Sequence, residues 1–340
     1  MQNPIVTGLM AYGMSGKVFH APFLETHPGF QLQAVLERNN KLAAKDYPQI
    51  KSYDTAEEII NDPAIELLVI NTPNNTHFEL SKKALLAGKH VLIEKPAATS
   101  AEEVRELFEL GRSQGKKVMI YQNRRFSSDF LATKQVIESG KLGQLIEVHL
   151  RFDRYRESIG PKKFKETPVP GSGILYDLGA HLIDQAISLF GNPQRFHKTL
   201  GKFRPGSQVD DYGHLHLQYP NHLNVFITVS LLAADPQPGI VIHGTKGSFI
   251  KSFCDTQEDQ LLGGMMPGDA GFGKELTGKE GKLTIVSDQG EKISSLIPSQ
   301  EGKYMNLFEA VFQTIRHDQP YQIREEEIVM QLDLLEMPAQ

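Results

Sequence analysis

Residues 5–16 read IVTGLMAYGMSG, a short apolar run followed at once by a turn rich in small residues. Against the dinucleotide fingerprint G-x-G-x-x-G, the turn has Ala11 where the first glycine is usual, then Gly13 and Gly16. Such a strand-to-helix turn lets backbone N–H groups approach a pyrophosphate with no Cβ in the way. An ordinary glycine-rich loop is the alternative for the turn taken alone. The candidate cofactor contacts here are Tyr12, Gly13, Met14 and Gly16.

The rest of residues 1–121 alternates in the same way between apolar runs and helical stretches. Capping-box patterns, in which Glu follows a short oxygen side chain by three residues, predict helix starts at Asp54, Thr76 and Ser100. Continuous apolar strands alternating with helices indicate a parallel sheet covered on both faces, that is, a doubly wound α/β domain. The predicted strands are residues 5–10, 32–36, 67–71, 90–93 and 117–121.

After residue 121 the pattern becomes that of an α+β domain, predicted to cover residues 122–340. Polar and apolar residues alternate in several runs, with turn residues between them, which is typical of antiparallel strands. Strands are predicted at residues 145–156, 212–219, 223–232, 239–243 and 283–286, and helices at 129–139 and 174–190. We therefore expect two domains, a Rossmann domain and a second domain with a mostly antiparallel sheet.

Composition excludes several functional classes. The 340 residues are 40% hydrophobic and 23% charged, as expected for a soluble globular protein. A net charge of −5 gives no reason to expect nucleic acid or an anionic membrane as a partner, and no apolar run approaches a membrane span. Cys254 is the only cysteine, and the amino terminus lacks a signal-peptide pattern, so we expect a cytoplasmic protein.

Glu37 ends the second predicted strand, where the fingerprint expects an acidic residue. A carboxylate at this place can accept both ribose hydroxyls of the adenosine and would repel a 2′-phosphate, which favours NAD. The next residue, Arg38, indicates the opposite, because a guanidinium suits a 2′-phosphate. Alternatively Arg38 stacks on the adenine or points to solvent. NAD is therefore the expected cofactor, and NADP remains an alternative.

An acid–base set is suggested by two further stretches, IEKP at residues 93–96 and GSGILYDLGAHLID at 171–184. Lys95 follows an apolar strand, and ligands of doubly wound sheets bind at the carboxyl ends of strands. Asp177 and His181 lie four residues apart on a predicted helix whose other residues are mostly apolar or small. Together they indicate proton and hydride chemistry on a hydroxyl group. The alternatives are a surface lysine and a solvated polar helix face.

Motifs for other chemistries are missing. There is no H-E-x-x-H, no cysteine cluster, no G-x-S-x-G and no Walker motif, so zinc hydrolysis, serine hydrolysis and phosphoryl transfer fit poorly. His214 and His216 share one face of a predicted strand, but we expect no metal there.

Taken together, these stretches resemble the Gfo/Idh/MocA oxidoreductases over nearly the whole chain. The likeness rests on the 11–16 turn, on EKP, on the D-x-x-x-H pair, and on two longer runs, NTPNNTHFELSKKALLAGKHVLIEKP (71–96) and HGTKGSF (243–249). Within the family, the chain looks most similar to inositol dehydrogenases of the scyllo-inositol type. The stretches that favour this subgroup are YGMSGKVFHAPF (12–23), QNRRFSSDFL (122–131) and RFDRYR (151–156).

The resemblance implies a Rossmann domain followed by an α+β domain whose large open sheet makes homodimer or homotetramer contacts. It also implies that Lys95, Asp177 and His181 form the catalytic set. Further implied cofactor contacts are Thr72, Pro73, His77, Glu94, Lys95 and Asn123. Candidates for contacts with substrate hydroxyls are Arg125, Tyr155 and Arg156.

The expected activity is NAD(P)-dependent hydride transfer involving a ring hydroxyl of an inositol-like polyol or sugar. His181 would take the hydroxyl proton, Lys95 would donate a hydrogen bond to the same oxygen, and Asp177 would orient the substrate or His181. A redox-neutral glycosidase that oxidises its substrate transiently is one alternative, recognisable by the absence of net NADH release. A dinucleotide-binding regulator is another, although such relatives tend to lose the three catalytic residues. The sequence leaves open the substrate, the direction of reaction, dimer or tetramer, and the isomer of the bond before Pro96.

Overall fold

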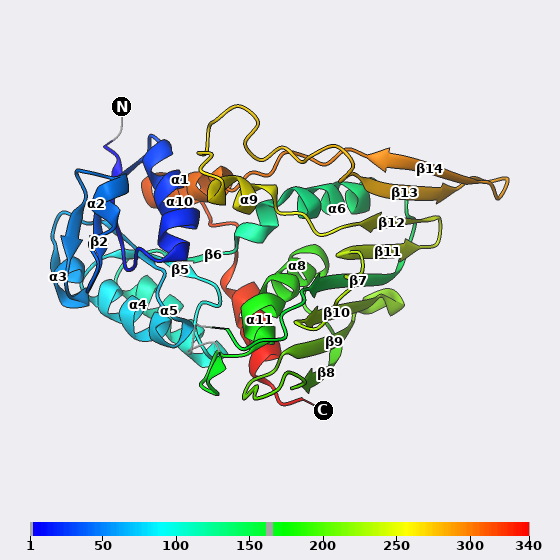
Figure 1. Ribbon diagram of the computed structural model, residues 1–340, viewed down its shortest axis with the longest axis horizontal. Coiled ribbons are helices and arrows are strands. Elements are labelled where there is room, and N and C mark those ends of the chain that lie inside the picture. The colour runs from blue at the N-terminus through cyan, green and yellow to red at the C-terminus, as the bar shows by residue number, and fades with distance from the viewer. Residues whose placement is uncertain (1–2, 161–165, 340) are drawn as a thin grey trace. The chain divides into compact units, whose positions relative to one another are not determined.

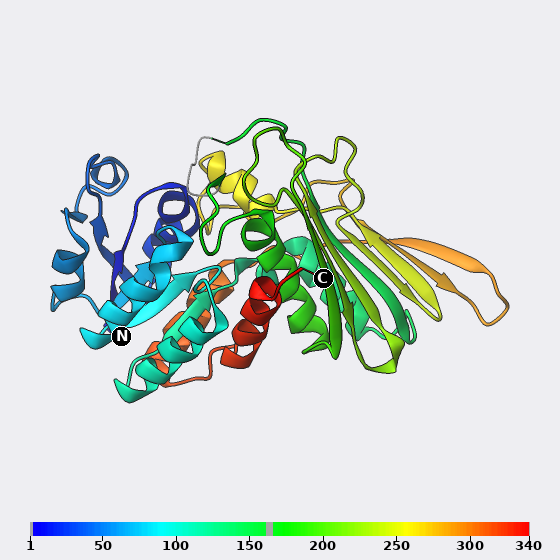
Figure 2. The same ribbon diagram turned by 90° about the horizontal axis from the view of Figure 1, so that it is seen from below.

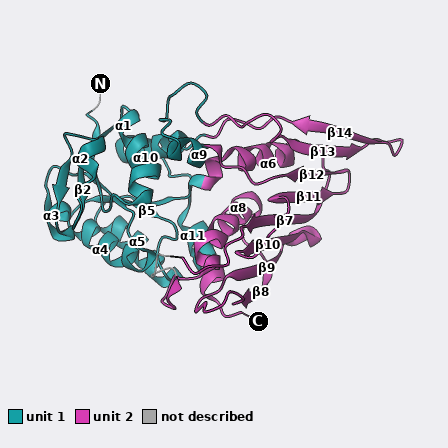
Figure 3. Cartoon of the chain, viewed as in Figure 1, with its two compact units in different colours: residues 1–123, 257–272, 303–332 teal, residues 124–256, 273–302, 333–340 magenta. Residues whose placement is uncertain are grey.

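The computed structural model describes residues 3–160 and 166–339. The chain forms two compact units (Figure 3). Unit 1 contains residues 1–123, 257–272 and 303–332, and unit 2 contains residues 124–256, 273–302 and 333–340. Unit 1 is therefore assembled from three separate parts of the chain, since two later segments join its long amino-terminal part.

Unit 1 is built on a six-stranded parallel sheet in the order β3-β2-β1-β4-β5-β6. Figure 1 labels β2, β5 and β6 of this sheet. The strand order reverses between β1 and β4, and ligands of such sheets bind outside the carboxyl ends of the strands at this point. The predicted doubly wound fold is confirmed, and only the short edge strand β3 was not predicted. The strands are β1 (Ile5–Leu9), β2 (Phe30–Leu36), β3 (Lys51–Tyr53), β4 (Leu67–Ile70), β5 (His90–Glu94) and β6 (Val118–Tyr121).

Helices from both ends of the chain complete unit 1. Phe308 of α10 stacks on Phe23 of α1 with ring centroids 5.1 Å apart, and Tyr121 of β6 lies 5.8 Å from the same Phe308 ring. These buried rings hold the late segment in the unit. The helices are η1 (Ser15–His20), α1 (Ala21–Thr26), α2 (Ala43–Asp46), α3 (Ala56–Asn61), η2 (Asn74–Thr76), α4 (His77–Leu86), α5 (Ala101–Ser113), α9 (Thr256–Leu262), α10 (Met305–His317) and α11 (Glu325–Glu336), the last continuing into unit 2.

The three predicted helix caps of unit 1 have different outcomes. The capping box at Ser100 is confirmed at the start of α5. Helix α3 also starts with a capping box, but Thr55 is the cap, one residue later than the predicted Asp54. At α4 the prediction was wrong, because the Thr76 hydroxyl donates instead to the carbonyl oxygen of Pro73, in the 3₁₀ turn before the helix. The sequence pattern therefore predicted the first residue of each helix to within one position. It predicted the capping side chain correctly only at Ser100.

Unit 2 is built on an eight-stranded sheet in the order β14-β13-β12-β11-β7-β10-β9-β8. Its neighbours pair antiparallel except β7 and β10, which are parallel, so the predicted mostly antiparallel sheet is confirmed. Strands β8, β12 and β14 were not predicted; β14 is exposed along almost its whole length and so lacks an apolar alternation. The strands are β7 (Leu145–Asp153), β8 (Arg195–Gly201), β9 (Tyr212–Gln218), β10 (Asn224–Ser230), β11 (Ile240–Gly244), β12 (Gly247–Lys251), β13 (Gly281–Val286) and β14 (Lys292–Ile297).

The longer helices of unit 2 pack on one face of this sheet (Figure 2). Strand residues on that face are buried, as Val148 and Leu150 show, whereas the alternate residues, such as His149, remain half-buried. The helices are η3 (Asn123–Phe126), α6 (Ser128–Glu138), η4 (Leu175–Gly179), α8 (Ala180–Phe190) and η5 (Pro220–His222). No helix among the described residues is both long and apolar enough to span a membrane.

Candidate functional site

The glycine-rich turn after β1 is held by Asn71, which follows β4. The Asn71 side chain accepts a hydrogen bond from the Ala11 N–H at 3.0 Å and donates one to the Ala11 carbonyl oxygen at 2.9 Å. Ala11 is not among the described non-glycine residues with positive φ, so its Cβ causes no backbone strain in place of the usual glycine. Asn71 was not singled out from the sequence, although it begins the NTPNNTH run.

Gly13 and Gly16 differ in what lies next to them. Gly16 packs closely against the turn, and Gly13 borders open space. A Cβ built on Gly16 would lie 2.2 Å from the Ala11 carbonyl oxygen and 2.9 Å from Asn71 Nδ2, so the close approach requires glycine. A Cβ on exposed Gly13 would meet no protein atom within 4 Å. Neither glycine has a positive φ. At position 13, therefore, neither the backbone conformation nor the packing inside the protein requires glycine. A glycine-lined turn at the switch point fits the pyrophosphate of a dinucleotide.

Residue Glu94, at the end of β5, connects this turn to Lys95. Its Oε1 accepts a hydrogen bond from the Ser15 hydroxyl at 2.6 Å and lies 2.8 Å from Nε2 of His20, while its Oε2 accepts one from the Lys95 N–H at 3.1 Å. Both Ser15 and His20 belong to η1, the helix that follows the turn. The helix that follows the glycine-rich turn and the backbone of Lys95 thus share one half-buried carboxylate. His20 and Ser15 were not predicted, although both lie in the YGMSGKVFHAPF run.

The Glu94 carboxylate is strongly acidic. Burial opposes its ionisation, yet the hydrogen bond and charge of His20, the Ser15 hydroxyl and the neighbouring Lys95 together hold the pKa of Glu94 at about 2, below its ordinary 4.5. Glu94 is therefore an anion at neutral pH, fixed beside the proposed catalytic lysine. The peptide bond between Lys95 and Pro96, which the sequence left open, is cis.

His77 joins the loops that follow β4 and β5. Its side chain is fully buried, with Nδ1 2.8 Å from the carbonyl oxygen of Pro96 and Nε2 2.8 Å from that of Thr72. Both ring nitrogens are therefore engaged by backbone, which makes His77 a residue that positions these loops. Thr72 is half-buried and hydrogen-bonded to the Thr76 hydroxyl, and Pro73 is exposed. Asn123 is buried just after β6.

Glu37, the predicted ribose contact, makes several hydrogen bonds within the protein. Its Oε1 accepts hydrogen bonds from the N–H groups of Leu42 at 2.8 Å and Ala43 at 3.2 Å. Its Oε2 accepts the Ser52 hydroxyl at 3.1 Å and lies 3.3 Å from the same Ala43 N. The buried carboxylate thus caps the short helix α2, and the neighbouring Arg38 is exposed.

In unit 2, Asp177 and His181 lie on consecutive turns of one continuous helical segment. Asp177 is half-buried in η4, a π-helical turn, and His181, 7% exposed, lies in the first turn of α8. Such π-turns often occur at functional sites. Lys95 belongs to unit 1 and these two residues to unit 2. Their joint catalytic role therefore stays a prediction.

The predicted substrate contacts of unit 2 differ in their surroundings. Arg125 makes a bidentate ion pair with buried Asp184, through Nε to Oδ2 at 2.8 Å and Nη2 to Oδ1 at 2.7 Å, which ties η3 to α8. Its guanidinium therefore has a structural partner in addition to any ligand. Tyr155 and Arg156 are exposed and follow β7. Only these last two present largely free surface.

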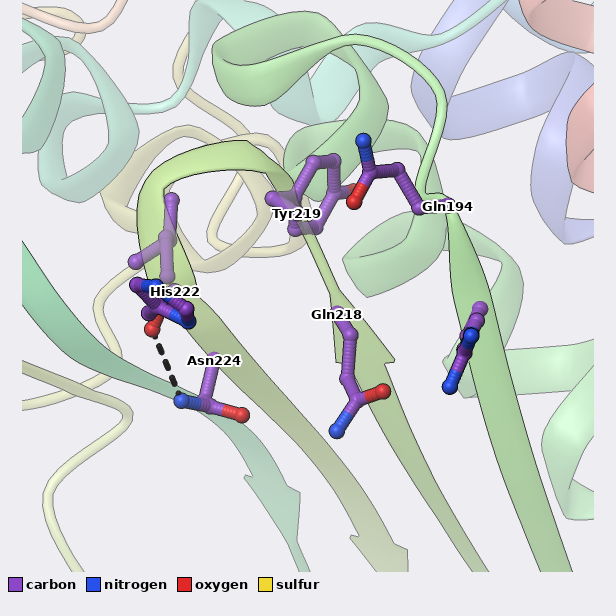
Figure 4. Close-up of a pocket in the computed structure, with 7 residues that line it drawn as sticks. Gln194, Gln218, Tyr219, His222 and Asn224 are labelled. Carbon is purple, nitrogen blue, oxygen red and sulfur yellow. Dashed lines mark hydrogen bonds between the residues drawn. The ribbon is translucent and has the colours of Figure 1, made fainter.

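A cavity of about 420 Å³ lies at the end of the unit 2 sheet near the β9–β10 turn (Figure 4). Its lining contains none of the predicted catalytic, cofactor or substrate residues; the residues are Gln194, Arg195, Gln218, Tyr219, His222, Leu223 and Asn224. His216 nearby lies 2.8 Å from Asn224 Oδ1, and His214 lies 3.0 Å from the Thr228 hydroxyl. Within residues 3–160 and 166–339, no group of acidic, histidine and cysteine side chains could hold a metal ion.

Two family models match the chain. Residues 6–122 match the oxidoreductase family with an NAD-binding Rossmann fold, and residues 130–250 match the GFO/IDH/MocA C-terminal domain. The two matches cover both units and together more than half of the chain.

Characterised and uncharacterised relatives agree with these matches. An uncharacterized oxidoreductase of Schizosaccharomyces pombe is 41% identical, over 92% of this chain and 90% of its own length. The scyllo-inositol 2-dehydrogenase (NADP(+)) IolW of Bacillus subtilis is 33% identical, over 98% of this chain and 92% of its own. Among solved structures, an oxidoreductase from Bacillus cereus is 36% identical with a TM-score of 0.89, covering 98% of this chain and 95% of its own.

Proposed function

The chain belongs to the Gfo/Idh/MocA oxidoreductase family, and from that premise we propose that it is an NAD(P)-dependent dehydrogenase acting on a ring hydroxyl of an inositol-like polyol or sugar. One observation carries the proposal: Glu94 connects the phosphate-binding turn, through Ser15 and His20, to the backbone of Lys95. The arrangement supports a dinucleotide and a reacting alcohol in one site. The substrate class is proposed from the similarity to a scyllo-inositol 2-dehydrogenase.

The chemistry divides among three residues of this chain. A bound nicotinamide would supply the acceptor for the hydride that leaves the carbon bearing the hydroxyl group. His181 takes the hydroxyl proton, so that a C–H bond and an O–H bond break as the C=O bond forms. Lys95 donates a hydrogen bond to that oxygen and stabilises the negative charge that develops on it. Asp177, one helical turn before His181, orients the substrate or the imidazole.

The surroundings of Lys95 support this role for its ammonium group. Glu94, the residue before it, is held as an anion by the His20 and Ser15 contacts and by the charge of Lys95. The loop that contains Lys95 is fixed a second time at Pro96, whose carbonyl oxygen contacts the buried His77 ring. Because the residues on both sides of Lys95 are held in place, its ammonium group is restricted to a narrow range of positions, which catalysis requires.

We also propose that the chain forms a homodimer or homotetramer through the unit 2 sheet. The longer helices of unit 2 cover one face of this sheet (Figure 2). The opposite face presents a half-buried ring, Phe226. Imidazoles surround this ring, with the centroid of His216 at 4.5 Å and that of His149 at 5.0 Å. Burying such a face against a second copy would remove apolar surface from water.

A cytoplasmic location completes the proposal. The sequence has a single cysteine, Cys254, which is half-buried and cannot form an internal disulfide. A protein that needs no disulfide fits a reducing compartment, where nicotinamide cofactors are also available to it.

The experiment is a panel of cyclic polyols and sugars, including scyllo-inositol and myo-inositol, followed by the nicotinamide absorbance with NAD and with NADP. We expect turnover with at least one ring polyol. Lys95→Ala and His181→Ala should each lower turnover by about 10²–10⁴-fold, the usual contribution of a positioned acid or base.

The matched control is Lys83→Ala, which removes another lysine of unit 1 whose ammonium group pairs with exposed Glu57 at 3.1 Å. This variant should keep wild-type turnover. Unchanged turnover in Lys95→Ala would end the proposal. Cleavage of a glycoside without net change of the nicotinamide absorbance would identify the redox-neutral alternative instead.

A further inference from the structure

We infer that the chain prefers NADP(H) over NAD(H) and that Arg38 binds the 2′-phosphate. Glu37 then has a structural role, which is to hold the start of helix α2. This inference rests on the proposed function, because it concerns the cofactor of the same site. It reverses the preference that the sequence suggested, in which the Glu37 carboxylate accepted the ribose hydroxyls.

Both carboxylate oxygens of Glu37 are engaged by the protein. Oε1 accepts two backbone N–H groups, from Leu42 at 2.8 Å and Ala43 at 3.2 Å, and Oε2 accepts the Ser52 hydroxyl at 3.1 Å. The side chain of Glu37 is also buried. These contacts already use most of the acceptor capacity of the Glu37 carboxylate inside the protein, which disfavours a further hydrogen bond to a ribose hydroxyl.

The helix that Glu37 caps is also fixed at its other end. Asp46, the last residue of α2, accepts hydrogen bonds at 2.8 Å from the Tyr12 hydroxyl and from the Lys17 ammonium group. Tyr12 belongs to the glycine-rich turn and Lys17 to η1, so α2 links the end of β2 to the phosphate-binding turn. Glu37 therefore belongs to the frame of the site, because it holds the amino-terminal end of a helix whose other end contacts the glycine-rich turn.

The charge of Glu37 is also compensated where it stands. Its negative charge faces the positive end of α2, since the N–H groups it accepts are those at the start of that helix. The repulsion that an uncompensated carboxylate would exert on a 2′-phosphate is thereby reduced.

Two cations follow β2, and the structure distinguishes them. The ammonium group of Lys41 donates to the Glu37 carbonyl oxygen at 2.7 Å and to Asp54 Oδ1 at 2.6 Å. Arg38 is exposed, and within residues 3–160 and 166–339 it forms no ion pair. Arg38 is thus the cation that remains available at the carboxyl end of β2, where the adenosine ribose binds in this kind of fold. A guanidinium donates two parallel hydrogen bonds to a phosphate, which suits it to this task.

The test is calorimetric binding of 2′,5′-ADP and 5′-AMP, two adenosine fragments that differ only in the 2′-phosphate. The wild-type protein should bind 2′,5′-ADP about ten- to a hundredfold more tightly, as expected for charge-assisted hydrogen bonds to one phosphate. Arg38→Ala should abolish this preference while leaving the 5′-AMP affinity within about twofold.

The matched control is Lys41→Ala, which removes an equal charge three residues away and should keep most of the preference. Glu37→Gln tests the structural role of Glu37 separately: it should lower the melting temperature, because it weakens the cap of α2, while the preference for 2′,5′-ADP over 5′-AMP should persist. The inference is overturned if the wild-type protein binds the two fragments equally, or if Arg38→Ala and Lys41→Ala reduce the preference to the same extent.

The binding readout separates this inference from the proposed function. Tight 2′,5′-ADP binding that depends on Arg38 supports the inference even if no polyol in the panel is oxidised. Conversely, oxidation of a polyol with NAD, together with equal binding of the two fragments, would support the proposed function and contradict the role of Arg38.

Discussion

Gly13 and Gly16 are both glycines of the dinucleotide fingerprint, but the structure gives them different physical reasons. Gly16 lies against the Ala11 carbonyl oxygen, so a side chain there would collide with the protein itself. Gly13 faces open space, so only a ligand could make a side chain unfavourable at that position. Gly16 therefore affects the stability of the turn, whereas Gly13 affects its capacity to bind a dinucleotide.

Substitutions at these positions should behave accordingly. Gly16→Ala should destabilise the protein by about 1–3 kcal/mol, the usual range for a side chain forced into filled space. Gly13→Ala should leave the melting temperature unchanged or slightly raised, yet weaken dinucleotide binding by about tenfold. Thermal unfolding and calorimetry on both variants check this. Wild-type dinucleotide affinity in Gly13→Ala would show that the pyrophosphate does not lie over this glycine.

Hydrogen bonds between side chains and distant parts of the chain were not predicted from the sequence. The fingerprint and EKP were recognised because their residues are contiguous. The Asn71 contact with Ala11 joins positions sixty residues apart, and the Glu94 contact with Ser15 joins positions seventy-nine apart. A local sequence pattern cannot predict these pairs, because the residues come close only when the parallel sheet has formed.

Among the elements, the helix starts show what local pattern can and cannot determine. Helix α3 was predicted to start from Asp54, but Thr55 accepts the N–H of Glu58 and the Glu58 carboxylate returns to the Thr55 N–H. Asp54 instead pairs with Lys41 across the loops. The pattern of a short oxygen side chain followed by glutamate occurs twice in overlapping register, and only the folded backbone chooses between the two.

This choice is measurable by comparing two alanine variants. Thr55→Ala should lower the free energy of unfolding by about 1 kcal/mol, the usual contribution of a helix cap. Asp54→Ala should change it little, because its ion pair with Lys41 is exposed to solvent. Urea denaturation of both variants provides the measurement. A larger loss in Asp54→Ala than in Thr55→Ala would return the cap to the position that the sequence suggested.

Both helices that carry proposed functional residues begin irregularly. η1, which follows the glycine-rich turn, and η4, which contains Asp177, are π-helical before they continue as α1 and α8. A π-turn rotates the side chains that follow it relative to an ideal α-helix. The simple i to i+4 argument for Asp177 and His181 therefore holds only approximately, and the irregular turn is a feature that residue spacing did not predict.

For the whole molecule, the covered and uncovered faces of the unit 2 sheet lead to the proposed self-association. Light scattering should give the mass of a dimer or tetramer for the wild-type protein. Phe226→Asp should shift that mass toward the monomer, because it removes the ring on which the imidazoles stack and places in the contact a carboxylate that has to lose its hydration. The control is Leu86→Asp, a similar change at a 58% exposed residue of unit 1, which should keep the wild-type mass. A monomeric wild-type protein would contradict this proposal.

The sequence by itself determined the class of fold, the strands β1, β2, β4, β5 and β6 to within about two residues, and the positions of the fingerprint, of EKP and of the D-x-x-x-H pair. Apolar periodicity, caps and glycine turns act between near neighbours, so they are readable along the chain. Only the tertiary structure decided that two later segments join unit 1, that Asn71 clamps the turn, and that Glu37 caps α2. These depend on contacts across long sequence separations, where each polar group takes the partner that the packed sheet brings within reach.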